Sequence, residues 1–172
     1  MLMFLSGAPK AGKSVVANAM ARLLSRKNES FFLERLCPDC EGNWTVESDR
    51  ADLARSEKLK LKGEGKFFSD CFIEMKQSAI QGLSRRFRLV ILDLGGIPSL
   101  ENATLVNTGV NTGVTCRAII LRPANADISE WVQFWNTANV PAIVIDTPDW
   151  RTNFEHREVF AAQILTAVCA QA

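Results

Sequence analysis

An eight-residue motif near the start of the chain constrains its fold more than any other feature. Residues Gly7 to Ser14 read G-A-P-K-A-G-K-S and match the pattern G-x-x-x-x-G-K-[ST] at every fixed position. The preceding apolar run, Leu2 to Leu5, is typical of a buried strand, and residues 14–27 carry apolar positions at helical spacing. A glycine-rich loop between a strand and a helix can turn its backbone N–H groups toward an anion. We therefore expect a phosphate-binding loop.

The motif also predicts what its members do. We expect the phosphates of a nucleoside triphosphate to be bound by the loop and the first helical turn, namely Gly7, Ala8, Pro9, Lys10, Ala11, Gly12, Lys13, Ser14 and Val15. Lys13 would reach the β and γ oxygens and act in catalysis by neutralising charge on the transferred phosphoryl group. The Ser14 hydroxyl would ligate Mg²⁺. ATP and Mg²⁺ are thus the expected cofactors, although this loop does not read the base.

A second motif supplies another metal ligand. Four consecutive apolar residues, Leu89 to Leu92, predict a strand that is covered on both faces, as in a parallel sheet. Asp93 follows at the carboxyl end of this strand, and Gly95-Gly96 come next. The order resembles the Walker B arrangement, in which the carboxylate holds a water on Mg²⁺ and a glycine lets the backbone approach the γ-phosphate. We expect Asp93 to complete the metal site with Ser14.

Strand and helix patterns alternate along the whole chain. Apolar runs predict five strands, at residues 2–5, 31–36, 89–92, 117–121 and 142–145. The intervening helical patterns predict an α/β fold of the P-loop NTPase class, with a doubly wound five-stranded parallel sheet flanked by helices, kinase-like in its arrangement. Right-handed crossovers would bring the loop, Asp39 and Asp93 to one edge of the sheet. No linker divides the sequence, so we expect a single domain over residues 1–172.

Several finer features follow from side-chain spacing. The helix that starts near Ser69 or Asp70 is expected to bury Phe72, Met75, Ala79 and Leu83. The tetrapeptide V-N-T-G at 106–109 repeats at once at 110–113, which favours an elongated surface loop after a helix at 101–107. Asp127 and Glu130 resemble a capping box for a helix that carries Ile128, Trp131, Val132 and Trp135 on one face. We expect the tryptophans to pack in the core.

The segment after the second strand carries the most distinctive chemistry. Residues 35–44 combine an arginine, carboxylates, an amide and a tryptophan. We expect Asp39 to be catalytic, either by orienting or deprotonating an acceptor hydroxyl or by positioning a water on Mg²⁺; alternatively, it caps a turn. Cys37 and Cys40 form a C-x-x-C pair, which is either a metal or redox site or a pair of reduced thiols. Lysines 58, 60, 62 and 66 form either a basic lid or a solvated loop.

Three stretches together resemble a known family. They are C-P-D-x-E-G-N-W at 37–44, G-x-P-x-x-G-K-S at 7–14 and D-L-G-G at 93–96. The combination is similar to a small P-loop module that accompanies, or is fused to, a CRISPR-associated ring-nuclease domain, and it extends from residue 1 to about 146. The resemblance implies a kinase-like P-loop fold, a link to type III CRISPR signalling by cyclic oligoadenylate, and a ring-nuclease partner. It does not transfer the nuclease activity, because this sequence lacks that domain. Cys40 and the duplication depart from the pattern.

Other branches of P-loop proteins fit less well. The guanine-specifying N-K-x-D is absent, which disfavours a GTPase, and Ala8 stands where partition ATPases have a lysine. The formal net charge of +1 and the lack of a long apolar run predict neither nucleic-acid recruitment nor membrane insertion, and a cytoplasmic location is expected. We expect an ATP-dependent phosphotransferase, acting on a small molecule or nucleotide, or an ATPase. The alternative is a nucleotide-dependent switch, or a binding module, that acts on a partner protein with slow or no turnover.

Overall fold

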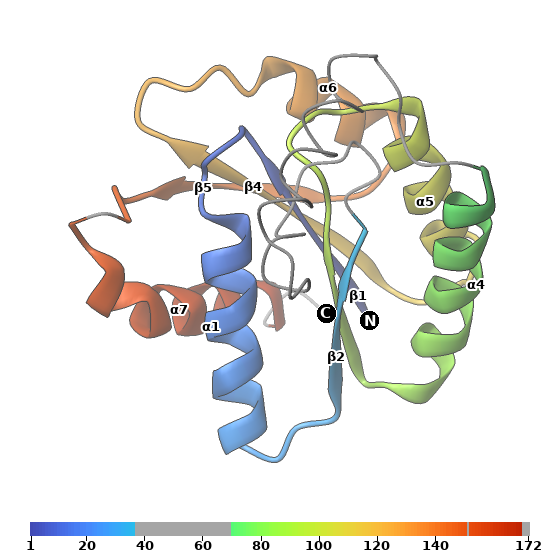
Figure 1. The fold of residues 1–172 in the computed structure, drawn as a ribbon, viewed down its shortest axis with the longest axis horizontal. Coiled ribbons are helices and arrows are strands. Elements are labelled where there is room, and N and C mark those ends of the chain that lie inside the picture. Colours follow the sequence, from blue (N-terminus) through green and yellow to red (C-terminus); the bar gives the residue numbers. More distant parts are fainter. Residues whose placement is uncertain (37–69, 151, 170–172) are drawn as a thin grey trace, which may run out of the picture.

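The computed structural model describes residues 1–36, 70–150 and 152–169 (Figure 1). The strands in this part are β1 (Leu2–Gly7), β2 (Phe31–Arg35), β3 (Leu89–Asp93), β4 (Cys116–Pro123) and β5 (Ala142–Thr147). The helices are α1 (Lys13–Arg26), α4 (Asp70–Arg86), α5 (Leu100–Val110), α6 (Ser129–Thr137), the 3₁₀ turn η1 (Phe154–His156) and α7 (Arg157–Cys169). The five expected strands are all present, and β4 and β5 extend two residues further than expected at their carboxyl ends.

The strands form one parallel sheet in the order β2-β3-β1-β4-β5. β1 lies at the centre, with Leu5 beside Asp93 of β3 and Gly7 beside Leu121 of β4. The chain therefore winds to one side of β1 for β2 and β3, and to the other side for β4 and β5. In doubly wound sheets such a reversal opens a crevice at the carboxyl ends of the strands. The end of β1, where the phosphate-loop motif begins, lies at this point of reversal.

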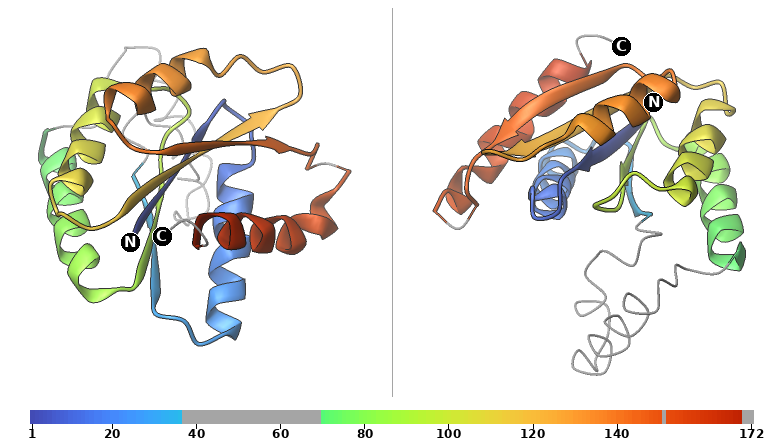
Figure 2. Two further views of the ribbon diagram at one scale, coloured as in Figure 1. Left: turned by 180° about the vertical axis from the view of Figure 1, so that it is seen from behind. Right: turned by 90° about the horizontal axis from the view of Figure 1, so that it is seen from above.

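Helices cover both faces of the sheet. Met3 and Leu5 of β1 are buried on the face that packs against α1 and α7, while Leu2 and Phe4 are buried on the face that packs against α4, α5 and α6. α1 and α7 lie side by side on their face, and the two additional views show the other helices across the sheet (Figures 1 and 2). This alternation arises because successive strand side chains point to opposite faces. The predicted layered α/β fold is confirmed.

The face that α4 buries was predicted wrongly in part. Met75 is 55% exposed, whereas Ile80 is fully buried and Ile73 and Leu83 pack against the same core. Seven residues make nearly two turns, so Ile73 and Ile80 fall on one stripe facing the sheet. The expected stripe was therefore rotated toward the solvent. On the same helix Lys76 lies over the Phe72 ring, 5.3 Å from its centroid, and pairs with Glu34 of β2.

The V-N-T-G duplication is not an elongated loop. Its first copy lies inside α5, where Val106 and Gly109 are buried. A Cβ atom on Gly109 would lie 2.8 Å from Cζ of Phe4, so the glycine allows the helix to approach the sheet closely. The second copy leaves the helix through Asn111 and reaches Gly113 at a φ of +76°. The same four letters adopt two structures because packing against the sheet favours helix only for the first copy.

Aromatic packing behind α6 agrees with the prediction for its tryptophans. Trp131 and Trp135 are buried, but Val132, expected on the same face, is 37% exposed.

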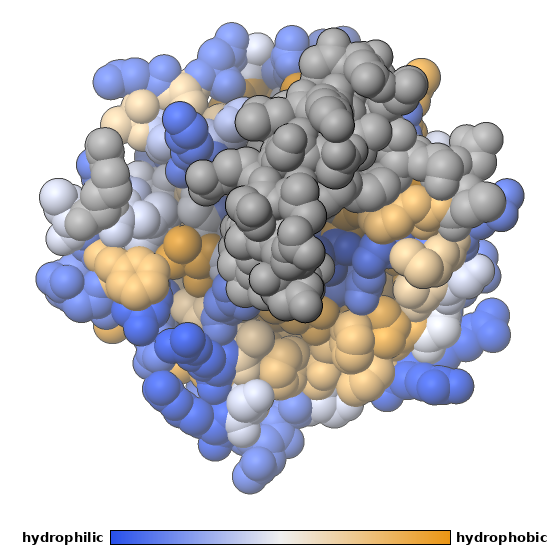
Figure 3. Space-filling view, viewed as in Figure 1, coloured by the Kyte–Doolittle hydropathy of each residue, from blue (hydrophilic) through white to orange (hydrophobic). Residues whose placement is uncertain are grey.

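Elsewhere on the surface, charged and apolar side chains are mixed, and orange apolar surface is visible between β2 and α4 (Figure 3). The rings of Phe32 and Phe87 contact each other at an interplanar angle of 49°, with centroids 5.3 Å apart. Among the described residues, none of the helices combines the length and the apolar character needed to cross a membrane.

Candidate functional site

The loop between β1 and α1 is bent at three positions with positive φ. Gly7 has φ +127°, Lys10 +65° and Gly12 +82°. A Cβ atom on Gly7 would lie 2.2 Å from the carbonyl oxygen of Leu121 on the adjacent strand, so only glycine fits there. Inside the loop, the N–H of Ala11 donates to the carbonyl of Ala8 at 3.2 Å. Backbone that alternates between right- and left-handed conformations turns successive N–H groups toward one side, which is the geometry of an anion nest.

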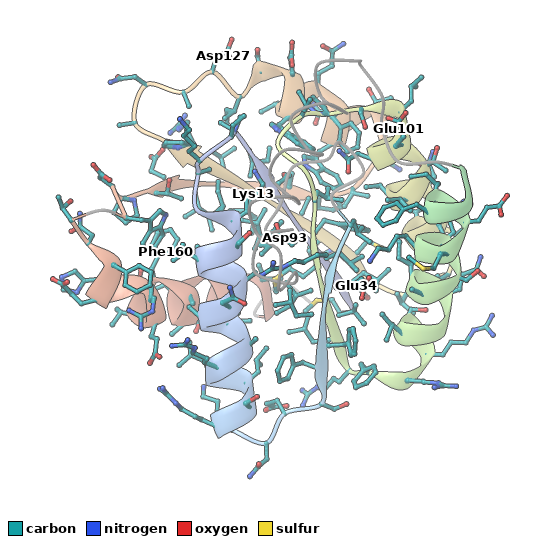
Figure 4. All side chains as sticks on the ribbon, in the orientation of Figure 1. Lys13, Glu34, Asp93, Glu101, Asp127 and Phe160 are labelled. Carbon is teal, nitrogen blue, oxygen red and sulfur yellow. The ribbon has the colours of Figure 1, made fainter. Side chains whose placement is uncertain are left out.

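Lys13 lies over this loop. It opens the first turn of α1, and its Nζ donates to the carbonyl oxygens of Gly7 and Ala8 at 3.1 and 3.2 Å. The side chain is half-buried, and Figure 4 shows it beside Asp93 at the top of α1. The ammonium group is therefore already held at the mouth of the loop, where it places a positive charge beside any bound anion.

Ser14 and Asp93 meet across the sheet edge. The Ser14 hydroxyl donates to Oδ2 of Asp93 at 3.0 Å, although the residues come from α1 and from the end of β3. Asp93 is 1% exposed. The pairing of β1 with β3 makes this possible, because it sets Asp93 next to Leu5, two residues before the loop begins. The contact between these two predicted metal ligands is thus a consequence of strand order.

The donor atoms of this pair fit magnesium. Mg²⁺ prefers oxygen ligands, takes few from the protein and keeps several waters. Ser14 and Asp93 offer one hydroxyl and one buried carboxylate, which is a donor set of that kind. In the parts of the chain that the structure describes, no group of three or more His, Cys, Asp and Glu side chains could form a richer metal site.

The connection from β3 to α5 is held at both ends. The N–H of Leu94 donates to the carbonyl of Leu5 at 3.0 Å, and Ser99 caps α5 by accepting from the N–H of Asn102 at 3.2 Å. The buried Asn102 amide also donates to the carbonyl of Ile97 at 2.8 Å. Sequence reasoning missed Asn102, because polar neighbours such as Glu101 and Thr104 hide its burial. These contacts fix the backbone of Gly95-Gly96 next to Asp93.

The end of β4 continues into a second ordered turn. The carboxylate of Asp127 accepts from the N–H of Ser129 at 2.8 Å, and this backbone hydrogen bond holds the pKa of Asp127 below its usual range. The helix cap itself is at Ile128, so the predicted capping box is replaced by a side-chain turn one residue earlier. Near the end of β4, Arg122 donates to Asp146 of the neighbouring strand β5 through Nε and Nη2 at 2.5 and 3.0 Å.

A tryptophan that follows β5 contacts the loop between β1 and α1. The Trp150 indole Nε1 donates to the carbonyl of Ala11 at 3.2 Å. Its ring packs edge-to-face on Phe160 of α7, with centroids 5.3 Å apart. Sequence reasoning did not single out Trp150. The available signal was its place just after the carboxyl end of a parallel strand, which lies at the same sheet edge as the loop.

The remaining predicted site residues lie outside the described part of the chain. These are Asp39, the pair Cys37 and Cys40, the motif at 37–44 and the lysines at 58–66. Their proposed roles therefore stay predictions. His156, by contrast, lies in the described part of the chain and is exposed.

Comparisons with solved structures agree with this architecture. The chain is similar to the APS kinase CysC of Mycobacterium tuberculosis, solved with AMPPNP and APS, at 12% identity and a TM-score of 0.51, over 97% of this chain and 96% of that one. It is similar to the kinase domain of the Escherichia coli tyrosine kinase ETK, at 15% identity and a TM-score of 0.54, over 84% of this chain and 67% of that one. It is also similar to the signal recognition particle receptor FtsY of Elizabethkingia anophelis, at 10% identity and a TM-score of 0.54. That match covers 93% of this chain and 56% of the receptor. No family model and no curated protein matches the sequence.

The chain has a kinase-like P-loop NTPase fold. The sheet order, the loop between β1 and α1 and these likenesses all agree on this point. At such low identities the neighbours show the fold alone, so the ligand and the reaction have to be argued from this chain's own residues.

Proposed function

We propose that this protein binds a nucleoside triphosphate with Mg²⁺ at residues 7–15 and transfers its terminal phosphoryl group. The observation that carries the proposal is the 3.0 Å contact between the Ser14 hydroxyl and Oδ2 of Asp93, with the side chain of Lys13, at the start of α1, bound to the loop backbone beside it. A cation site beside a nest of N–H groups and an ammonium group is the donor set that phosphoryl transfer uses. ATP is the proposed nucleotide, since the turn after β4 carries no N-K-x-D.

Each residue has a defined task in this proposal. Lys13 exchanges its two carbonyl partners for phosphate oxygens, so its charge moves from the loop backbone onto the ligand. Ser14 and Asp93 hold the cation, which when bound neutralises charge on the β and γ oxygens. The backbone N–H groups of the loop orient the phosphate chain. Gly95-Gly96, fixed next to Asp93, leave backbone N–H groups close to the terminal phosphate.

The acceptor is proposed to be a small molecule or a nucleotide. Asp39 is the proposed orienting group or base for its hydroxyl, because residues 37–44 follow β2, which ends at the same sheet edge as β1 and β3. An Asp39→Asn variant should bind ATP normally and lose transfer. Full transfer by this variant would remove the assignment. The link to type III CRISPR signalling, with a ring-nuclease partner, stays a prediction that rests on the motif at 37–44.

A nucleotide-dependent switch is the second candidate, and one observation favours it. Leu100 is 84% exposed and Ile97 is 42% exposed, directly after the glycines beside Asp93. Apolar side chains on a segment that contacts the γ-phosphate could carry the nucleotide state to a partner protein. In that case hydrolysis would be slow, insensitive to small acceptors and faster with the partner.

Phosphate release and phosphate transfer separate these candidates. The wild-type protein would be incubated with MgATP labelled at the γ position, alone and with pools of nucleosides, nucleotides and small hydroxy compounds. We expect label to appear on an acceptor, with loss of transfer in Ser14→Ala. Lys27→Met, at the far end of the same helix, is the control and should keep wild-type activity. Hydrolysis that no acceptor changes would support the switch, and no nucleotide binding at all would refute both.

A further inference from the structure

Trp150 contacts the phosphate-loop motif at its most constrained point. A Cβ atom on Gly12 would lie 2.0 Å from Nε1 of Trp150 and 2.3 Å from its Cδ1. The indole therefore rests directly on the Gly12 backbone. The same Nε1 donates to the carbonyl of Ala11, so one side chain both covers and hydrogen-bonds the Ala11–Gly12 peptide. Gly12 is the second fixed glycine of the motif, and a larger residue at this position would collide with the indole.

The hydrogen bond fixes the direction of this peptide group. In a trans peptide the C=O and the following N–H point to opposite sides. Because the carbonyl of Ala11 points to the indole, the N–H of Gly12 points away from it. Gly12 has φ +82°, a conformation in which the neighbouring peptide planes turn sharply, so the orientation of this plane decides where the N–H is aimed.

The indole is itself held in place. Phe160 contacts it edge-to-face, with an interplanar angle of 83°, and both rings pack against the core between α1 and α7. Figure 4 shows Phe160 on α7, on the side of α1. α7 is also tied to α1 by the pair of Arg26 and Glu158, whose shorter contact is 2.7 Å. The tryptophan is therefore a rigid support for the loop and not a freely moving surface group.

We propose that Trp150 is a positioning residue for anion binding. By holding the carbonyl of Ala11, it aims the N–H of Gly12 at the phosphate chain. Trp150 therefore strengthens binding of the phosphates and makes no contact with the base. This inference rests on the proposed function, because it assigns the support of the same nucleotide site. It adds a residue that lies more than 130 positions after the loop in the sequence and that belongs to neither phosphate-site motif.

Binding of two probes tests this assignment. The dissociation constants of MgATP and of inorganic triphosphate with Mg²⁺ would be measured for wild type and Trp150→Phe, which keeps a ring but loses the N–H. Loss of one hydrogen bond should weaken both probes equally, by about fivefold. Trp131→Phe is the matched control, because the buried Nε1 of Trp131 has no hydrogen-bond partner in the described structure; it should leave both constants unchanged. Thermal midpoints would be recorded for all variants.

The outcomes separate this inference from the proposed function. Wild type that binds neither probe would refute the proposed function itself. Normal binding by a folded Trp150→Phe protein would overturn only the role of Trp150. Weakening of MgATP alone would also overturn it, since that result means contact with the base. If the variant does not fold, the wild-type indole N–H resonance of Trp150 decides: we expect slow solvent exchange and a shift on adding triphosphate, and fast exchange without a shift would contradict the proposal.

Discussion

Ser14 and Asp93 are 79 positions apart in the sequence, and the hydroxyl of the first donates to the carboxylate of the second at 3.0 Å. Neither residue would be informative alone, since a serine at a helix start and an aspartate after an apolar run are both common. Their contact follows from the parallel pairing of β1 with β3. It brings two local sequence patterns together at the point where the proposed function places a cation.

The charge of Lys13 gives the first prediction. Lys13→Met should weaken MgATP binding by about tenfold or more, because charge-assisted hydrogen bonds to the phosphates are lost. The thermal midpoint should change little, since Lys13 is half-buried and donates to carbonyl oxygens of the loop backbone. Equilibrium titration measures the first quantity and a melting curve the second. Lys27→Met serves as the control, and equal binding by the two variants would argue against the assigned role.

Replacing two glycines, each by alanine, should change the stability of the fold in opposite directions. Gly109→Ala places a methyl group 2.8 Å from Phe4 in the core, and we expect this overpacking to destabilise the fold by about 1–3 kcal/mol. Gly82 lies in α4 with nothing within 4 Å of the new atom. Gly82→Ala should therefore stabilise it by about 0.5–1 kcal/mol through helix propensity. Urea unfolding of both variants measures this, and the same sign for both would contradict the packing.

A buried hydroxyl links β1 to α6. Ser6 is fully buried, donates to the carbonyl of Ile119 at 2.9 Å and accepts from Nε1 of Trp135 at 2.8 Å. Ser6→Ala strands the indole N–H in the core, so we expect a loss of about 1–3 kcal/mol of unfolding free energy. In a Trp135→Phe background the same substitution should cost less, because no indole donor is left. Equal costs in both backgrounds would show that the two side chains are not coupled.

The contact between α1 and α7 should be sensitive to acid. Arg26 donates to Glu158 through Nη1 and Nη2 at 2.7 and 3.1 Å, which lowers the pKa of the carboxyl below its usual range. A lowered pKa means that the stabilisation is complete above the ordinary glutamate value of about 4.3 and is lost as the pH falls through the lowered one. The melting temperature of wild type should therefore lie above that of Glu158→Gln at pH 7, and the difference should be smaller at pH 3.

The control for this pH dependence is Glu155→Gln, which removes a charge of the same sign nearby. Glu155 is exposed, and within the described part of the chain it pairs with His156 at 3.7 Å. We expect the melting temperature of Glu155→Gln to equal that of wild type at pH 7 and at pH 3. A gap between wild type and Glu158→Gln that persists in acid would mean that the Arg26 contact does not carry the difference.

Local patterns predicted the fold well, including the segments that bring Ser14 and Asp93 into contact. The strand before Gly7, the helix after Ser14 and the apolar run before Asp93 are short and continuous, so sequence alone located them. Contacts set by tertiary packing were not predictable in this way. Trp150 reaches the loop only because β5 ends at the same sheet edge as β1, and the first V-N-T-G copy became helix because Gly109 fits against Phe4. Sequence spacing carries no record of such approaches.

The Mg²⁺ dependence of ATP binding tests the central claim most directly. The dissociation constant would be measured with and without Mg²⁺ for wild type and for Asp93→Asn, which keeps the size of the side chain and removes its charge. The account predicts that Mg²⁺ strengthens binding to wild type by about tenfold or more and leaves binding to Asp93→Asn nearly unchanged. An equal Mg²⁺ effect in both proteins, or no ATP binding by wild type, would contradict it.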